Sequence, residues 1–357
     1  MSWLDMSLSE LTDELKALRE PVFRAKQIYA WLHKGANFDE MTNLPKQLRE
    51  RLKEHLPLGG VTVLEKIISK LDGTTKYLFL LSDGNIVEGV LMHYKYGNTF
   101  CISSQVGCRM GCVFCASTID GLVRNLTPGE MLGQILAIER EWSQEGRDSG
   151  RGRAVTNIVM MGSGEPLDNY DNTIKFLHMI NDPAGINISL RNISLSTCGL
   201  VDKIPVLAKD APGVTLSISL HAPNDTLRKE MMPIANRYSI AQIIAAAREY
   251  VNLTGRRVIF EYALVQGKND SDACALELSA ILHGLQCHIN LIPLNTVKER
   301  NLHGTALRRA HEFCTLLESL SISATIRREM GDDIQGACGQ LRRSYLQDTK
   351  TISNPNT

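Results

Sequence analysis

Four cysteines fall within one short stretch of the chain, TFCISSQVGCRMGCVFCAS, at residues 99–117. Three of them, Cys108, Cys112 and Cys115, have the spacing C-x3-C-x2-C, and Cys101 lies seven residues before that set. Because thiolates bind soft metals, this spacing indicates zinc or an iron–sulfur cluster. No second C-x2-C pair exists, so a zinc ion would depend on a distant His or Cys as its fourth ligand. Three thiolates on a four-iron cluster would leave one iron open for a substrate or cofactor.

The surroundings of the three cysteines favour the iron–sulfur alternative. Phe114 stands directly before the third cysteine, and a predicted strand precedes the loop. In these respects the loop resembles the radical S-adenosylmethionine (SAM) superfamily. The resemblance implies a [4Fe–4S] cluster whose open iron holds the amino and carboxylate groups of SAM. It also implies that one electron cleaves SAM to a 5′-deoxyadenosyl radical.

A second motif, MMGSGEP at residues 160–166, ends the next predicted strand. Its glycines would let the backbone approach the SAM amino group, with Glu165 as a charge partner. Alone the motif is a weak signal, but its place in strand–helix–strand order after the cysteine loop strengthens it. Polar side chains also end later predicted strands, namely Ser196, Ser219, His221 and Asn295. A strand-end cap or a core hydrogen bond would explain each of these equally well when taken alone.

Alternating strands and helices must position these side chains. The predicted strands are FCISSQ, TNIVMMG, NISLST, TLSISLH, VIFEYALV, HINLIPL and SATIRRE. Helical periodicity lies between them at 127–143, 170–181, 239–253, 271–284 and 305–320. Such alternation predicts an α/β fold with a parallel sheet and outer helices, whose strand ends carry the chemistry. Before this region, residues 8–55 show helical periodicity, and residues 61–104 predict a small β-hairpin or meander.

The composition is that of an ordinary globular protein and excludes few classes of function. The hydrophobic fraction is 43%, the mean hydropathy is -0.11 and no apolar run is long enough for a membrane span. No secretory signal is evident, so we expect a cytoplasmic protein with reduced thiols. The net charge is zero, with a pI of about 7.1, which gives no general argument for a polyanionic partner. Local basic runs, such as Lys46, Arg49, Arg51 and Lys53, are either solvated helix faces or an RNA-facing surface.

Longer motifs narrow the resemblance to one family. The sequences VEGV, CISSQVGC, GEP, SLHAPND, MPI, NLIPLN and GDDIQGACGQL occur in this order. They are similar to the RlmN/Cfr family of radical SAM RNA adenine methyltransferases, from the N-terminal helices to about Leu341. The match is better to the RlmN branch, because GEP at 164–166 and MGDD at 330–333 follow that pattern.

The resemblance implies a fold and a division of the chain. The fold would be a partial (β/α)6 radical SAM barrel with an N-terminal helical accessory domain. We expect an RNA-contacting helical domain at 1–56, a β-hairpin extension at 57–98, the barrel at 99–345 and a flexible tail at 346–357.

The resemblance also implies roles for single residues. Cys338 would take a methyl group from one SAM and carry it to adenine, and Glu88 would accept a proton from the substituted carbon. SAM contacts would come from Gly164, Glu165, Ser196, Ser219, Leu220, His221 and Asn295. Cys101 has two interpretations: a buried strand cysteine, or the second sulfur that releases RNA from Cys338 by forming a disulfide. The remaining cysteines, Cys198, Cys274, Cys287 and Cys314, are expected to be small buried residues.

The expected reaction is methylation of carbon 2 of adenosine in 23S rRNA, and in tRNA, with two SAM consumed per methyl. An electron donor such as flavodoxin and a monomeric state are expected, and no membrane is. Two alternatives stay open: carbon 8 methylation of 23S rRNA in the manner of the Cfr branch, and a non-catalytic zinc RNA-binding module.

Overall fold

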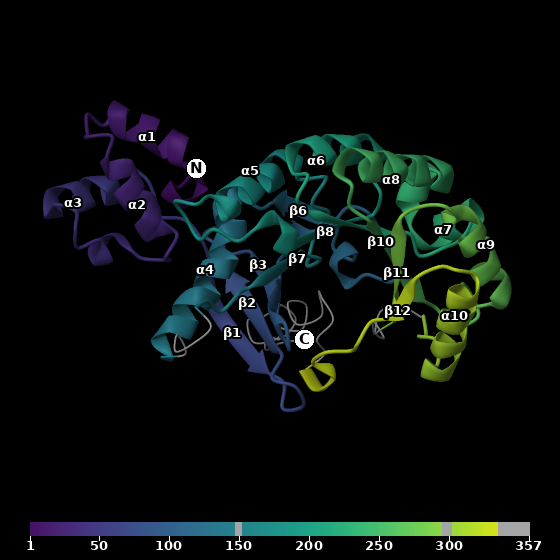
Figure 1. Cartoon of the computed structure of the whole chain (residues 1–357). Helices are drawn as coiled ribbons and strands as arrows, with labels where there is room; N and C mark the ends of the chain where they lie inside the picture. The colour runs from purple at the N-terminus through teal and green to yellow at the C-terminus, as the bar shows by residue number, and fades with distance from the viewer. Residues whose placement is uncertain (147–151, 295–301, 335–357) are drawn as a thin grey trace, which may run out of the picture.

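A computed structural model describes residues 1–146, 152–294 and 302–334. Its central feature is one curved sheet with the strand order β1-β2-β3-β4-β7-β8-β9-β10-β11-β12 (Figure 1). The strands are β1 (Thr62–Ile68), β2 (Thr75–Leu80), β3 (Ile86–Tyr94), β4 (Gly97–Cys101), β7 (Asn157–Met160), β8 (Ile193–Thr197), β9 (Thr215–Ser219), β10 (Val258–Leu264), β11 (Cys287–Pro293) and β12 (Ala324–Ile326). No helix in the described ranges is both long and apolar enough to cross a membrane.

The part of the sheet from β4 to β12 is parallel. In the described chain, six of these strands are each followed by a helix before the next strand of the same sheet begins, and the helices lie outside the sheet (Figure 1). The helices are α4 (Pro128–Gln144), α5 (Tyr170–Asn181), α6 (Ile204–Asp210), α8 (Ile240–Thr254), α9 (Asp272–Leu282) and α10 (Leu307–Ser319). The predicted partial (β/α)6 barrel is therefore confirmed.

Sequence periodicity missed three short features of the barrel. These are α6, α7 (Asp225–Met231) and a separate two-stranded sheet of β5 (Gln105–Gly107) and β6 (Leu122–Asn125). A helix of seven residues makes only two turns, which is too short for a 3.6-residue period to stand out. The cysteine loop connects the two strands of this small sheet, since β5 ends just before Cys108 and β6 begins at Leu122, after Cys115.

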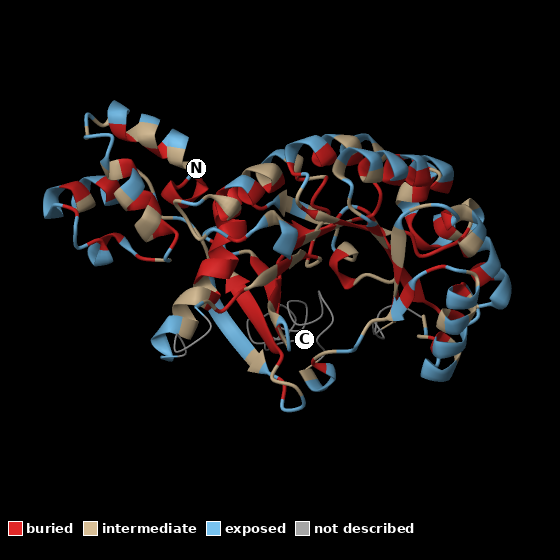
Figure 2. Cartoon of the chain, viewed as in Figure 1, coloured by how far each residue is buried: buried red, intermediate tan, exposed pale blue. Residues whose placement is uncertain are grey.

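The two faces of the parallel sheet differ because side chains alternate along each strand. In β9, Leu216 and Ile218 belong to the hydrophobic core beneath the helices. Ser217 and Ser219 occupy the alternate positions, so they point to the concave face. Figure 2 shows the same division, with helix surfaces buried toward the sheet and exposed outward. The polar positions of the strands are thus collected on the concave side.

Strands β1 to β4 extend the sheet by antiparallel pairing. On the core face, Tyr77 and Phe79 pack against Phe100 at ring distances of 6.3 and 6.2 Å. The alternate residues of the same strands therefore point to the concave face, which continues into the barrel. Among them are Lys76, Glu88 and Cys101.

The N-terminal helices α1 (Leu8–Ala17), α2 (Arg24–Leu32) and α3 (Lys46–His55) form a lobe at one end of the sheet (Figure 1). The first residues of the chain join this lobe to the barrel. The Trp3 indole donates to the carbonyl of Leu52 at 2.9 Å, and the Asp5 carboxylate accepts from the amide of Gly129 in the first turn of α4 at 3.0 Å. The lobe is thus packed on α4, and the predicted boundary at residue 56 stays a prediction.

His33 makes a second contact between the lobe and the barrel. Its Nδ1 accepts a hydrogen bond from the amide of Ile186 at 3.3 Å, and its ring lies 4.1 Å from that of Tyr29. Burial lowers the pKa of His33 to about 4, against an opposing effect of Asp182. Protonation would place a second N–H against the Ile186 amide, so the folded protein disfavours the charged ring.

We expect acid to weaken this contact. Because the pKa is lower in the folded than in the unfolded state, the stabilisation is present above about pH 6.5 and is lost as the pH falls toward 4. The contribution of His33 to the free energy of unfolding should be about 2 kcal/mol smaller at pH 5 than at pH 7. Urea unfolding of wild type and His33→Asn at both pH values checks this. An equal pH dependence in the two proteins would contradict it.

Candidate active site

The three clustered cysteines follow β5 in a loop packed between strand ends. Cys108 and Cys112 are buried and Cys115 is half-buried, all within a small cluster that includes Met231, Met232 and Val265. The Thr118 hydroxyl lies 3.0 and 2.9 Å from the carbonyls of Cys112 and Cys115 and fixes the turn. The loop therefore gathers three sulfur donors around one apolar site.

The electrostatics of this loop favour metal binding over free thiolates. Burial raises the pKa of Cys108 to about 12, and it raises that of Cys112 further, so without a cation both sulfurs keep their protons. Bound iron would supply the positive charge that thiolates need at this site. Three soft donors among apolar side chains fit the ligand chemistry of an iron–sulfur cluster. Among the described residues, no group of three or more His, Cys, Asp or Glu side chains, the three cysteines included, has the geometry of a site that could hold a metal ion, so side-chain geometry does not separate zinc from an iron–sulfur cluster.

The glycine-rich end of β7 packs tightly on the segment that precedes the cysteine loop. The Gly162 amide donates to the carbonyl of Ile102 at 3.0 Å. A Cβ at Gly162 would lie 2.6 Å from that carbonyl oxygen, and one at Gly164, where φ is +112°, would lie 2.6 Å from the Gln105 side chain. The space beside Gly162 and Gly164 is thus filled by backbone and side-chain atoms of residues 102–105. These contacts hold the strand end against the loop.

Glu165 connects two neighbouring strand ends. Its carboxylate accepts from the amide of Leu167 at 3.0 Å and from that of Cys198, just after β8, at 2.7 Å. Burial raises the pKa of Glu165, although these hydrogen bonds oppose the shift. The carboxyl group therefore lies at the carboxyl edge of the sheet, beside the sulfur cluster.

His221 lies between the end of β9 and the cysteine loop. Its backbone is left-handed, with φ at 57°, and its Nδ1 accepts from the amide of Ala263 at 2.9 Å. The ring meets that of Phe114 edge-on at 4.6 Å. Burial lowers the pKa of His221 to about 3, so the ring is neutral at physiological pH. Leu220 before it is fully buried, and Ser196 and Ser219 are half-buried on the concave face.

Arg228 on α7 is a site residue that sequence reasoning missed. Its side chain is fully buried, and its guanidinium donates to the carbonyls of Cys198 at 2.7 Å, Ser219 at 3.2 Å and Leu220 at 3.2 Å. It thereby ties the ends of β8 and β9 together. Nothing in the sequence distinguishes Arg228 from surface arginines, because its burial depends on the tertiary fold.

Glu88 and Cys101 lie together on the concave face beside this edge. Cys101 is opposite Val90 in the register of β3 and β4, and Glu88 is two residues from Val90 along the same face. The Ser103 hydroxyl donates to the Glu88 carbonyl at 2.8 Å, which brings Glu88 level with the chain that enters the cysteine loop. A further residue that sequence reasoning missed is Lys76, whose Nζ is 3.5 Å from Glu88 Oε2.

The segment after β12 crosses the open side of the barrel to the turn between β1 and β2 (Figure 1). Met330 packs against the cluster of Val90, Met92 and Cys101. The Asp333 carboxylate accepts from the Ser69 hydroxyl at 2.6 Å and from the Lys70 amide at 2.9 Å. This anchor stands shortly before Cys338, which lies outside the described residues, as does Asn295.

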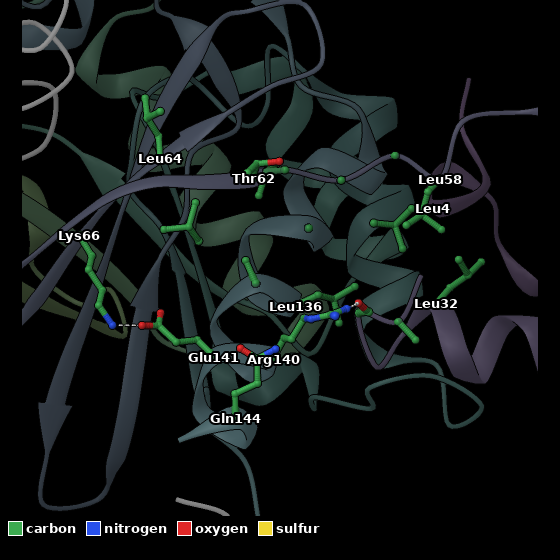
Figure 3. A pocket seen from close by; sticks show the side chains of 18 of the residues that line it. Leu4, Leu32, Leu58, Thr62, Leu64, Lys66, Leu136, Arg140, Glu141 and Gln144 are labelled. Atoms are coloured by element: carbon green, nitrogen blue, oxygen red, sulfur yellow. Dashed lines mark hydrogen bonds and ion pairs between the residues drawn. The ribbon is translucent and has the colours of Figure 1, made fainter. Parts of the chain in front are cut away.

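A groove of about 570 Å³ lies elsewhere, between the N-terminal lobe, β1 and α4 (Figure 3). Leu4, Leu32 and Leu136 line its apolar part, and an ion pair between Lys66 and Glu141 lies at its other end. None of the predicted site residues lines it. The groove is therefore separate from the candidate active site.

Comparison with known proteins decides the family. The model of the radical SAM superfamily matches residues 102–277, and that of the ribosomal RNA large subunit methyltransferase N-terminal domain matches residues 1–58. A probable dual-specificity RNA methyltransferase RlmN from Clostridium novyi is 51% identical over 97% of this chain and 98% of its own length. One from Lachnospira eligens is 53% identical over 96% of both chains. The chain belongs to the RlmN family of radical SAM RNA methyltransferases.

A solved structure agrees with this RlmN assignment. The crystal structure of a radical SAM methyltransferase from Sphaerobacter thermophilus is 45% identical and has a TM-score of 0.90, covering 95% of this chain and 98% of that one. The chain is thus a SAM-dependent RNA methyltransferase with a radical SAM barrel, and SAM and a [4Fe–4S] cluster are the cofactors that its family implies. The comparisons favour neither the Cfr-like alternative nor the zinc module.

Proposed function

We propose that this RlmN family member methylates carbon 2 of adenosine in 23S rRNA and in tRNA. The observation that carries the proposal is the shared position of Glu88 and Cys101. Both side chains point to the concave face beside the cysteine loop, and the segment that leads to Cys338 packs against the same surface. Ile334, the last described residue, is four residues before Cys338 in the sequence.

The cofactors would occupy the carboxyl edge of the parallel strands. Cys108, Cys112 and Cys115 would hold the [4Fe–4S] cluster. SAM would bind next to it along the strand ends, at Gly164, Glu165, Ser196, Ser219, Leu220, His221 and Asn295. When bound, these groups supply a methyl group and a 5′-deoxyadenosyl radical. The neutral ring of His221 and the buried Arg228 keep the strand ends in place around them.

The protein's own residues would carry the methyl group. The Cys338 thiolate would accept the methyl group that one SAM supplies, forming a C–S bond, and S-adenosylhomocysteine would leave. The S-methyl group of Cys338 would lose one hydrogen atom to the radical that the bound cofactors supply, and its carbon would then bond to carbon 2 of adenine. Loss of one electron to the redox group that the cysteine loop would hold, together with loss of the carbon 2 proton to Glu88, would restore the aromatic ring.

Cys101 would release the product. Its thiolate attacks the Cys338 sulfur, so an S–S bond forms and the C–S bond breaks. The electron pair of that bond stays on the methylene carbon, which takes a proton and becomes the methyl group. A dithiol reductant of the cell then reduces the disulfide, as a catalytic disulfide in a reducing compartment requires.

RNA contact by the N-terminal lobe stays a prediction, and the structure limits which charges would supply it. In α3, Arg49 donates to the carbonyl of Asp39, Arg51 pairs with Glu20, and Lys53 pairs with Asp39 at 2.7 Å. The carboxylates of Glu20 and Asp39 partly neutralise Arg51 and Lys53, whereas the hydrogen bond of Arg49 to a carbonyl leaves its charge unchanged. An electron donor such as flavodoxin, a monomeric state and a cytoplasmic location also stay predictions.

Mapping methylated adenosines in cellular RNA tests the proposal. Digested 23S rRNA and tRNA from cells with and without the gene would be compared by mass spectrometry that separates the isomers. We expect 2-methyladenosine to disappear on deletion, to return with the wild-type gene and to stay absent with Cys338→Ala. Loss of 8-methyladenosine instead would establish the Cfr-like alternative. No change in either isomer would refute adenosine methylation.

A further inference from the structure

The Lys76–Glu88 pair is an unusual feature of the concave face. The Lys76 side chain is fully buried and that of Glu88 is 5% exposed, with Nζ and Oε2 3.5 Å apart. Taking an ammonium and a carboxylate out of water has a large desolvation cost, which their attraction only partly offsets. An apolar pair of similar size would be about as stable at such a site. Stability alone therefore does not explain the pair.

The register of strands β2, β3 and β4 places the Lys76–Glu88 pair relative to Cys101. Lys76 is opposite Val90 in β3, and Val90 is opposite Cys101 in β4, so the three residues form one row across the sheet. Glu88 belongs to the next row on the same face, since it is two residues from Val90. The ammonium thus lies on the side of Glu88 that faces away from the barrel strands, deeper in the antiparallel extension.

The two residues adjacent to Glu88 in the sequence, Val87 and Gly89, carry no charge. Val87 belongs to the hydrophobic core on the opposite face, and a Cβ on Gly89 would lie 2.7 Å from the Phe100 ring and 2.9 Å from that of Phe79. This close packing fixes the backbone of β3 and therefore the position of the Glu88 Cα atom. Lys76 then supplies the positive charge beside its carboxylate.

We propose that Lys76 is a positioning residue that holds the Glu88 carboxylate in place and directs it so that it can accept the proton from carbon 2 of the bound adenosine. This inference rests on the proposed function. In the step, the C–H bond breaks, its electron pair stays in the adenine ring and the proton moves to a Glu88 oxygen.

Substitutions in the full-length enzyme loaded with its cluster would test the role of Lys76. The variants are Lys76→Met, Glu88→Gln, the double variant, and Lys66→Met as a matched control. Lys66 lies on the same antiparallel extension and pairs with Glu141, but both side chains are partly exposed. The measurements are SAM cleavage, methyl on Cys338, methylated RNA released, and protein–RNA adduct on a nuclease-treated gel.

We expect Lys76→Met to cleave SAM and methylate Cys338 within about twofold of wild type, while released product falls at least tenfold and adduct accumulates. The double variant should lose no more than Glu88→Gln alone, because residues that act in one step are not additive. Lys66→Met should behave as wild type. If Lys76→Met does not fold, Lys76→Gln, which keeps a donor without the charge, replaces it with the same expected results.

The outcomes separate this inference from the proposed function. If Glu88→Gln releases methylated RNA normally, the role proposed for Glu88 is wrong, whatever Lys76 does. If Glu88→Gln accumulates adduct but the Lys76 variant releases product at the wild-type rate, the inference about Lys76 is wrong. An additive loss in the double variant, or an equal loss of every step in Lys76→Met, would show a general structural role instead.

Discussion

Alanine at Cys108, Cys112 or Cys115 should remove the cluster and all cleavage of SAM. Each sulfur would bind a different iron, and the fourth iron has to stay open for SAM, so three thiolates are the minimum set. The described structure adds a reason: these sulfurs lie in an apolar cluster where burial raises the pKa of Cys108 to about 12. Two thiolates with a small cavity in place of the third could not hold the cluster.

Iron and sulfide analysis, visible absorption and reductive cleavage of SAM measure the effect. We expect complete loss of all three signals in each variant. Cys274→Ala is the matched control, because Cys274 is also buried but lies on α9, away from the loop. It should keep wild-type iron and cleavage. Full iron content with SAM cleavage in any one of the three loop variants would remove that cysteine from the ligand set, and zinc in place of iron would favour the non-catalytic alternative.

The Cys101→Ala variant should stop after a single attack on RNA, with the RNA still attached to Cys338. The variant keeps the cluster, Cys338 and Glu88, so methyl transfer to protein and attack on RNA should proceed. The thioether between Cys338 and adenine then persists, because no second sulfur reaches Cys338. Cys101 is 4% exposed in a small apolar cluster, and its replacement by alanine should cost only about 1 kcal/mol of folding free energy.

A denaturing gel of the variant purified from cells would show this state as a band above the free protein that disappears with nuclease. Two controls fix the interpretation. Neither Cys338→Ala nor the double variant Cys101→Ala/Cys338→Ala should carry RNA, because the thioether cannot form without Cys338. Normal turnover by Cys101→Ala, or the absence of attached RNA, would assign Cys101 to packing alone and place the resolving step elsewhere.

Chemistry that depends on contiguous residues could be predicted from the sequence of this protein. The spacing of the three cysteines and the glycine-rich strand end are local patterns, and the alternation of strands and helices is a periodic one. The predicted strands and the five predicted helices appear in the structure, because each is long enough to show its period and to bury one face. The short helix α7 was missed, and so was Arg228, which it carries.

Contacts between distant segments required the tertiary structure. Lys76 and Glu88 are twelve residues apart on different strands, and only the register of β2 and β3 brings their charges together in the interior. Arg228 likewise becomes a site residue because the ends of β8 and β9 surround it with carbonyls. A lysine or an arginine in a sequence is expected at the surface, and burial is a property of the surrounding chain. Local sequence reports propensity and motif, whereas burial and pairing follow from packing over the whole fold.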